Sequence, residues 1–485
     1  MPRIAQLRRP ALLPLLFALA ALCVAAPGAS EDYDKALAKL KEGRPAEALP
    51  LLEAARERQP SDPDVLYNLA GCYFSLNRSD EGVRMAEELA RQNSRDPAVL
   101  LAAASLLTEH GSPAKAAEML TAADALAPGN PLVLNSLASA QLKAGDMGGA
   151  ATSLERLLSN LRRTLSPETR ATLASASQTA ATLQAADPTS VRLGMLAAEF
   201  DLTAERPAEA LETLRPLAAA AVRDPDYYKL LALADTRLHR LPEAIAAGRS
   251  ALQLAPTRQD LLVNLAGVYQ MARDNEAAIR LLQDAVRRGE ASPEIYFALA
   301  LSQFNFGSYE DAVRSCDRAL TIDPKFDRAA LLKGRSYEKL SKRGEAIEWL
   351  GRALKLNPAC EYCRYELAST LIAENRLPEA EPLLRQVVAT TPSNVSAQYE
   401  LGKLLDARGE TADALAALHA AVAADPDQDK AWYLLGRIYA RKGDKVQAEH
   451  AMAAVKEIKE RRLHAARQHL DGAAKSAPHL TPAQP

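Results

Sequence analysis

The chain has 485 residues, of which 48% are hydrophobic and 25% are charged, so it is long and apolar enough to bury a sizeable core. Its 59 basic residues nearly balance its 61 acidic residues, which leaves a formal net charge of −2. This balance argues against nucleic acid as a partner, because nucleic-acid-binding domains usually carry a strongly basic surface. Aromatic residues make up only 5% of the chain and alanine is abundant, a composition that suits closely packed helices.

Residues 1–26 have the pattern of a secretion signal. Arg3, Arg8 and Arg9 precede an apolar run over residues 11–26, and small residues follow it. A positively charged N-terminal region, a short apolar segment and small residues at the cleavage site are typical of a cleaved signal peptide. The run is shorter than the roughly 20 residues that span a bilayer, and no later segment is apolar enough to do so. We therefore expect a protein exported to the periplasm or secreted; the alternative is an uncleaved membrane anchor.

A 34-residue period organises the rest of the chain. In-phase units over residues 29–164 predict four repeats, and units over residues 191–462 predict eight more. Each unit holds two segments of helical periodicity separated by a short polar turn. One column of the register holds a small residue in every unit: Ala48, Gly82, Ala116, Ala150, Ala210, Ala244, Ala278, Ala312, Ala346, Ala380, Ala414 and Ala448. A fixed period of this length with two helices per unit is typical of an all-α solenoid.

The small residues predict where helices approach most closely. A second column, in the first segment of each unit, holds Ala300, Gly334, Ala368 and Gly402. Glycine inside a helix costs about 1 kcal/mol relative to alanine, so its presence there suggests a contact that tolerates no side chain. We expect both columns to be buried between helices.

Residues 165–190 fall outside the register. Ser166-Pro167 reads as a helix start and Asp187-Pro188 as a stop, with only Leu173 and Leu183 as large apolar residues between them. The segment is predicted to be one irregular helical insert, which buries little surface and forms a joint between two blocks of repeats. After the last unit, residues 456–469 read as a charged helix that caps the array, and residues 463–485 form a polar tail.

Residues 429–460 resemble the tetratricopeptide repeat. The columns that carry the resemblance are Trp432-x2-Leu435-Gly436-x2-Tyr439 and Ala448-x3-Met452, with Met where the family usually has an aromatic residue. The resemblance implies a right-handed superhelical solenoid of about twelve helical hairpins. It also implies a non-catalytic role in which the concave face, lined by the first helix of each pair, holds protein or peptide partners.

Two columns on the expected first helices are candidates for partner binding. One column is mostly aromatic and holds Phe297, Leu331, Tyr365, Tyr399 and Tyr433. The other, four residues on, is partly cationic and holds Leu301, Arg335, Ser369, Lys403 and Arg437; of these two columns we take Phe297, Arg335, Tyr365, Tyr399, Lys403, Tyr433 and Arg437 as binding candidates, together with Phe304. Residues four apart lie on one helix face, and aromatic and Arg side chains are frequent anchors of protein interfaces. The alternative is that the aromatic residues simply pack between neighbouring first helices.

Cys360-Glu361-Tyr362-Cys363 stands at the start of a predicted first helix. In an oxidising compartment the two cysteines could form a disulfide, or they could remain free thiols. A redox role is a weaker alternative, because no strand pattern surrounds the motif, and one pair of cysteines is a poor zinc site. Cys316 shares a column with Leu350, Leu384 and Leu418 and is expected in the core.

The sequence contains no further constellation typical of catalysis, and we expect neither a metal nor a cofactor. The seven histidines have no metal-ligand spacing, and no glycine-rich loop follows a strand. The main hypothesis is an exported scaffold that binds a protein or peptide in its groove. The alternatives are a cell-envelope assembly factor, for secretion or polysaccharide export, and a thiol oxidoreductase that uses Cys360 and Cys363.

Overall fold

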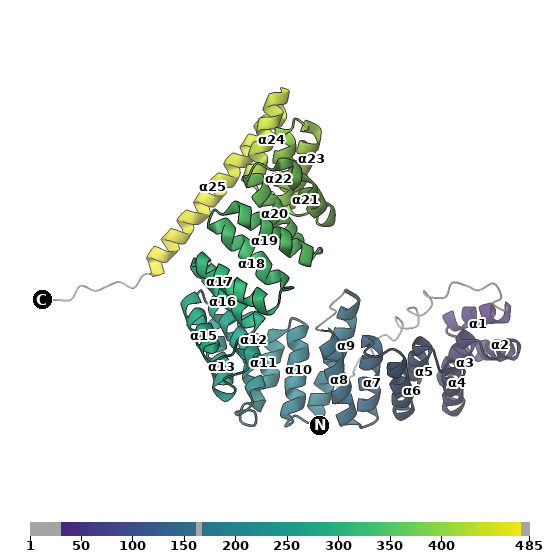
Figure 1. Ribbon diagram of the computed structural model, residues 1–485. Helices are drawn as coiled ribbons and strands as arrows, with labels where there is room; N and C mark the ends of the chain where they lie inside the picture. Colours follow the sequence, from purple (N-terminus) through teal and green to yellow (C-terminus); the bar gives the residue numbers. More distant parts are fainter. Residues whose placement is uncertain (1–30, 162–166, 477–485) are drawn as a thin grey trace. The chain divides into compact units, whose positions relative to one another are not determined.

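The computed structural model describes residues 31–161 and 167–476, and within these ranges the protein consists of helices joined by short turns, with no strand (Figure 1). The predicted all-α solenoid is thus confirmed. The helices are α1 (Glu31–Lys41), α2 (Pro45–Arg58), α3 (Pro63–Ser75), α4 (Ser79–Gln92), α5 (Pro97–Glu109), α6 (Pro113–Leu126), α7 (Pro131–Lys143), α8 (Met147–Leu161), α9 (Pro167–Ala186), α10 (Val191–Thr203), α11 (Pro207–Leu214), α12 (Pro225–Arg237), α13 (Leu241–Leu254), α14 (Gln259–Met271), α15 (Asn275–Arg287), α16 (Pro293–Phe306), α17 (Tyr309–Ile322), α18 (Asp327–Lys339), α19 (Arg343–Leu356), α20 (Glu361–Ala373), α21 (Leu377–Thr390), α22 (Val395–Ala407), α23 (Thr411–Ala424), α24 (Asp429–Lys442) and α25 (Lys445–Ser476).

Apart from α9, the helices of the described chain follow one another as consecutive pairs, and on either side of α13 most helices pack mainly on the helices next to them in sequence. Successive first helices begin 34 residues apart from α3 to α7 and again from α10 to α24, which is the period found in the sequence. The chain divides into two compact units, one up to Ala247 and one from Gly248 on, so the boundary lies within α13. Each unit is a stack of helix pairs.

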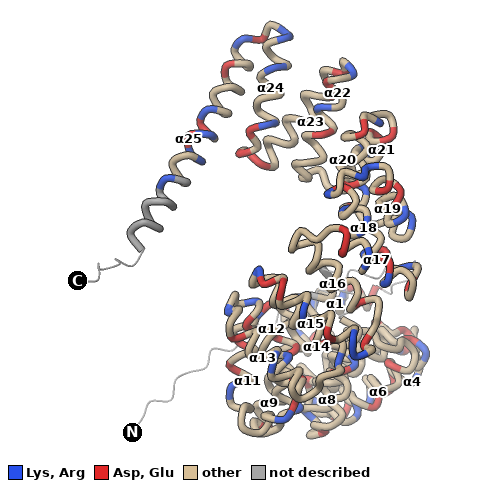
Figure 2. The backbone as a smooth tube through the Cα atoms, turned by 60° about the vertical axis from the view of Figure 1, so that its left-hand side comes forward, with Lys and Arg blue, Asp and Glu red and all other residues tan. Residues whose placement is uncertain are grey.

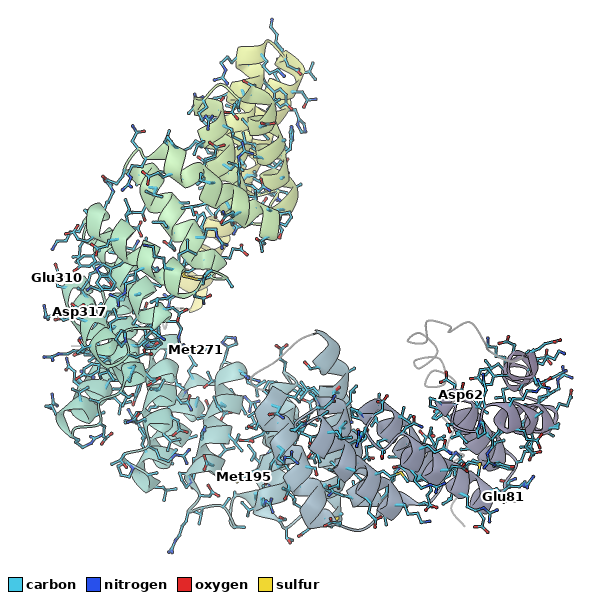
Figure 3. The ribbon with its side chains drawn as sticks, turned by 45° about the vertical axis from the view of Figure 1, so that its right-hand side comes forward. Asp62, Glu81, Met195, Met271, Glu310 and Asp317 are labelled. Atoms are coloured by element: carbon cyan, nitrogen blue, oxygen red, sulfur yellow. A yellow bond between two sulfur atoms is a disulfide. The ribbon has the colours of Figure 1, made fainter. Side chains whose placement is uncertain are left out.

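Helix starts and turns repeat the same local chemistry from pair to pair. At the start of α3, the Asp62 carboxylate accepts hydrogen bonds from the backbone N–H groups of Asp64 and Val65, and Pro63 takes the first helical position (Figure 3). The turn inside each pair contains one residue in the left-handed conformation. These residues are Gly43, Asn77, Gly111, Gly145, Glu205, His239, Arg273, Gly307, Ser341, Asn375, Gly409 and Gly443. Half of them are not glycine, so the sequence did not reveal this column as it revealed the small residues.

The small-residue columns lie where they were expected. In the second helices, every member from Ala48 to Ala414 is buried, and Ala448 in the last pair is partly buried. In the first helices, a Cβ added at Gly402 would lie 2.7 Å from Leu418 Cγ, and one added at Gly334 would lie 2.8 Å from Leu350 Cγ. The glycines therefore stand where a neighbouring leucine occupies the space that their own side chain would need.

The insert is a single helix, α9, that begins at Pro167 and ends before Asp187. It packs against α7, α8 and α10 inside the first unit, and it buries a stripe formed by Leu173, Ala176, Ala180 and Leu183. It therefore buries more than its composition suggested. The boundary between the two units lies at Ala247 and not at residues 165–190, where the break in the register predicts a joint.

The array ends in a long helix, because the second helix of the last pair and the predicted cap are one continuous element, α25. Lys and Arg alternate with Asp and Glu along its described length (Figure 2). Arg461 and Arg462 form ion pairs with Asp427 and Asp429, at 2.7 and 3.1 Å, which hold α25 on the start of α24. The predicted signal peptide, residues 1–26, lies outside the described residues. Within them, no helix is both long and apolar enough to cross a membrane.

Candidate functional site

The predicted binding residues lie on successive first helices, as expected: Phe297 and Phe304 on α16, Arg335 on α18, Tyr365 on α20, Tyr399 and Lys403 on α22, and Tyr433 and Arg437 on α24. The structure does not bring them together in one site. Those on α16, α18 and α20 contact neighbouring repeats, whereas those on α22 and α24 line a pocket.

The aromatic rings of α16 pack against the next repeat. The ring centroid of Phe297 lies 5.3 Å from that of Phe326, and the Arg328 guanidinium lies 5.0 Å from the Phe297 ring. The Arg335 guanidinium lies 4.9 Å from the centroid of the Phe304 ring. These cation–π contacts between α16 and α18 match the packing interpretation of the aromatic column.

Helix α20 uses its tyrosines in the same way. Arg335 also lies 5.4 Å from the Tyr362 ring, so one guanidinium links α16, α18 and α20. Partial desolvation raises the pKa of Tyr362, which stays 47% exposed, to about 12, and a hydrogen bond to Glu366 adds to the rise. Burial also raises the pKa of Tyr365, while a hydrogen bond from Ser396 of α22 acts against that rise. Both phenols are therefore neutral and engaged by neighbouring side chains at physiological pH.

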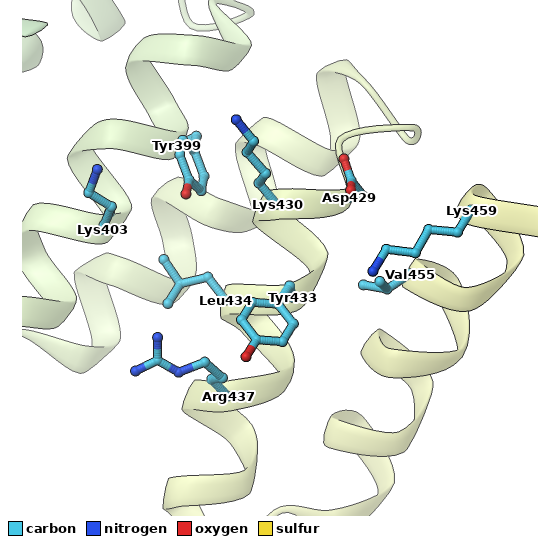
Figure 4. A pocket seen from close by; sticks show the side chains of 9 residues that line it. All are labelled: Tyr399, Lys403, Asp429, Lys430, Tyr433, Leu434, Arg437, Val455 and Lys459. Atoms are coloured by element: carbon cyan, nitrogen blue, oxygen red, sulfur yellow. The ribbon is translucent and has the colours of Figure 1, made fainter. Parts of the chain in front are cut away.

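Four of the predicted residues, Tyr399, Lys403, Tyr433 and Arg437, share a pocket of about 380 Å³ between α22, α24 and α25 (Figure 4). We call it the C-terminal pocket. Five further residues complete its lining, and the sequence did not single them out: Asp429, Lys430, Leu434, Val455 and Lys459. The spacing of Lys430 from Tyr433 and Arg437 on one helix would have identified it. Val455 and Lys459 belong to α25, and only the folded pair brings them to this position.

The C-terminal pocket carries unbalanced positive charge. Lys403 is paired with Glu400 at 2.7 Å, and Asp429 is paired with Arg462 at 3.1 Å. Lys430, Arg437 and Lys459 form no ion pair with any described residue. The lining carries four basic groups against one carboxylate, that of Asp429, so an anionic ligand would meet favourable electrostatics there.

An apolar floor lies between these charges. Leu434 and Val455 are each 6% exposed, while the Tyr433 side chain is 49% exposed, and its ring lies between them in the view of Figure 4. Exposed aromatic rings beside cationic and apolar side chains are frequent anchors of protein interfaces, and the Tyr433 ring has these surroundings. The pocket can therefore hold an apolar side chain and several carboxylates at once.

Cys360 and Cys363 are joined by a disulfide at the start of α20, with their Cα atoms 5.3 Å apart. Cys360 is the N-cap residue, and its sulfur accepts a hydrogen bond from the Cys363 N–H at 3.1 Å. Cys363 is 1% exposed, whereas Cys360 is half-buried. Cys316 is in the core, as predicted, and burial raises the pKa of its thiol well above the ordinary value. Within the described ranges, no group of three or more His, Cys, Asp or Glu residues is placed to hold a metal ion.

Comparisons with known proteins agree with the observed repeat. Two family models described as tetratricopeptide repeat match the chain, one at residues 39–106 and 341–405, the other at residues 101–168, 265–325 and 399–461. No protein of curated function matches the sequence.

Several solved structures are similar in part. MamA from Desulfovibrio magneticus RS-1 is 24% identical, over 35% of this chain and 95% of its own, with a TM-score of 0.33. YrrB, titled a TPR protein with an unusual peptide-binding site, is 23% identical over 38% of this chain and 97% of its own, with a TM-score of 0.34. The APC/C hetero-tetramer Cut9-Hcn1 is 13% identical over 83% of this chain and 88% of the matched chain, with a TM-score of 0.41.

Proposed function

Since this chain belongs to the tetratricopeptide repeat family, we propose that it is a non-catalytic scaffold that binds an acidic protein or peptide segment in its C-terminal pocket. Repeats of this family generally hold other proteins and do not catalyse reactions. The observation that carries the proposal is a set of three cations that form no ion pair within the described part of the chain, Lys430, Arg437 and Lys459, around an exposed tyrosine.

The charges of the pocket favour anionic groups, and carboxylates are the anionic groups that an unmodified protein segment supplies. Arg437 offers a planar group that can bind a carboxylate through two parallel hydrogen bonds, and the two lysines add compact charges on either side. Because the cations are exposed at the rim, their attraction is screened by salt, with a Debye length of about 8 Å at physiological ionic strength. Binding should therefore weaken as salt is raised.

The test uses fluorescein-labelled peptides of equal length that carry zero, three or six glutamates, measured by fluorescence anisotropy with the full chain. We expect affinity to rise with the number of glutamates. The double substitution Lys430→Glu and Arg437→Glu should weaken binding of the six-glutamate peptide by at least tenfold. The double substitution Arg314→Glu and Arg318→Glu makes the same change in net charge on the exposed side of α17 and should leave binding unchanged. Equal affinity for all three peptides, or equal loss in both variants, would contradict the proposal.

The aromatic contribution is tested separately. Tyr399→Ala and Tyr433→Ala should each weaken capture of the acidic peptide, whereas Tyr365→Ala should change it little because that ring contacts the next repeat. Circular dichroism of each variant checks that helicity is preserved. If Tyr365→Ala weakens capture most, the binding surface lies nearer α20 than we propose.

We further propose that the scaffold acts outside the cytoplasm, on the basis of the pattern in residues 1–26. N-terminal sequencing of the mature protein would find a new N-terminus near residue 27 if the signal is cleaved, and an intact Met1 would contradict this. Co-purification with envelope fractions would favour the related role of a cell-envelope assembly factor over that of a freely secreted binder.

A further inference from the structure

The last helix pair exposes a side chain that every comparable pair of the second unit buries. Met452 of α25 occupies the register column that holds Cys316, Leu350, Leu384 and Leu418 in the preceding pairs. Those four residues are fully buried, at 0% exposure, whereas Met452 is 45% exposed. Side chains in this column are therefore normally buried by neighbouring helices, whereas in the last pair the side chain stays partly exposed.

In the earlier pairs the column residue lies against its own first helix, as Met452 does against Gly436, and the first helix of the next pair completes its cover. Cys316 of α17 forms a buried cluster with Ala300 of its own first helix and with Leu332 of α18. Leu418 of α23 lies in the same cluster as Leu434 and Leu435 of α24. Nothing among the described residues occupies the corresponding position beside α25.

The uncovered face continues into the C-terminal pocket. Met452, Val455 and Lys459 follow one another at helical spacing on α25, and the last two line the pocket. Across from them, Lys430, Leu434 and Arg437 follow the same spacing on α24. Two antiparallel helices thus present a groove with an apolar floor and a cationic rim, the arrangement that receives one face of an amphipathic helix.

We propose that a partner protein docks an acidic amphipathic helix here, in the place that the first helix of a further repeat would take. The proposal rests on the function proposed above and names the class of partner. The occupant is helical because the equivalent face of each earlier pair receives a helix of 13 or 14 residues, α18, α20, α22 and α24. It is acidic because Lys430, Arg437 and Lys459 lack carboxylate partners in the described structure.

The probe is a 14-residue peptide that copies α24, the helix that covers α22 and α23. Glutamate replaces Lys430, Arg441 and Lys442, and a hydrocarbon staple joins positions 433 and 437, which face solvent in α24. Fluorescence anisotropy with the full chain measures its affinity. Met452→Arg should weaken binding at least tenfold, because a charge would be buried under the docked helix. Met452→Leu restores the residue of three earlier pairs and should bind the peptide as tightly as the native chain or more tightly.

Three results would overturn helix docking. Unchanged affinity of Met452→Arg means that the face is not used. Equal affinity for an unstapled version with proline at positions 434 and 438 means that the ligand binds in an extended conformation. The proposed binding of acidic segments would still stand in that case, because the glutamate-peptide test depends on Lys430 and Arg437 alone. A dimer in light scattering that Met452→Arg converts to a monomer assigns the face to a second copy of the chain. If no acidic peptide binds in any form, the proposed function itself fails.

Discussion

The close approach of helices at Gly402 gives the sharpest test of how the repeats pack. Gly402→Ala introduces a methyl group 2.7 Å from Leu418 Cγ, 3.0 Å from Leu418 Cδ2 and 3.2 Å from the Ala414 carbonyl oxygen. Leu418 is fully buried, so it has little room to move away. Overpacking of this kind typically costs about 1–3 kcal/mol.

Gly351 provides the matched control. It also lies inside a helix, α19, but a Cβ added there meets nothing within 4 Å. Gly351→Ala should therefore raise the free energy of unfolding by about 1 kcal/mol, the usual gain of alanine over glycine in a helix. Both variants share this gain, so the difference between them isolates the contact with Leu418. We expect Gly402→Ala to be less stable than Gly351→Ala by about 1–3 kcal/mol.

Two measurements check this difference. Urea denaturation followed by circular dichroism gives the stability of the array, and hydrogen exchange with mass spectrometry locates the change, because repeat arrays can open locally. Faster exchange in α22 and α23 of Gly402→Ala, with slower exchange in α19 of Gly351→Ala, is the expected result. Equal shifts in both variants would refute the argument that a vacant side chain permits the helix contact.

Four other predictions follow from single positions. Ala346→Asp buries a carboxylate without a partner and should lower the free energy of unfolding by several kcal/mol, roughly 3 or more, seen as a lower melting temperature. Ser341 has φ 60°, so Ser341→Gly should stabilise the protein by about 0.5–1 kcal/mol in urea denaturation. The His110 ring stacks on Phe74 with ring centroids 4.1 Å apart, and burial lowers the pKa of His110, so protonation of this ring opposes folding. The free energy of unfolding should therefore decrease as pH falls below about 6.5, where the unfolded chain takes up the proton first. Thermal melts from pH 8 to 5 should show a smaller decrease for His110→Phe, which cannot be protonated. Cys363 is 1% exposed, so Cys363→Ser and the native chain should show equal disulfide-reductase activity; a specific loss in the variant would favour the thiol oxidoreductase alternative.

The fold could be predicted from the sequence because its main contacts repeat. Each pair contains the same close helix contact, which leaves no room for a large side chain. The small residues from Ala48 to Ala414 therefore recur at a fixed spacing, and this spacing can be recognised in the sequence. The left-handed turn residues recur equally often but escaped notice, because Glu205, Arg273 and Ser341 adopt a conformation that sequence patterns assign to glycine.

The candidate site was only half predictable. Tyr399, Lys403, Tyr433 and Arg437 were found because they recur at fixed spacing on first helices. The spacing did not distinguish them from Phe297 and Tyr365, whose rings contact the next repeat. That distinction depends on what lies beside each ring, which periodicity does not encode. Lys459 was missed because it belongs to a second helix, where nothing in the register marks a position near the groove.

The sequential packing of helix pairs has a consequence for how the chain acquires its structure. Contacts join segments that are close along the sequence, so a pair loses little chain entropy when it closes. Such arrays can nucleate at many points and grow outward from each. A polypeptide that emerges from a pore or a ribosome with its N-terminus first could thus consolidate pair by pair, long before α24 and α25 appear.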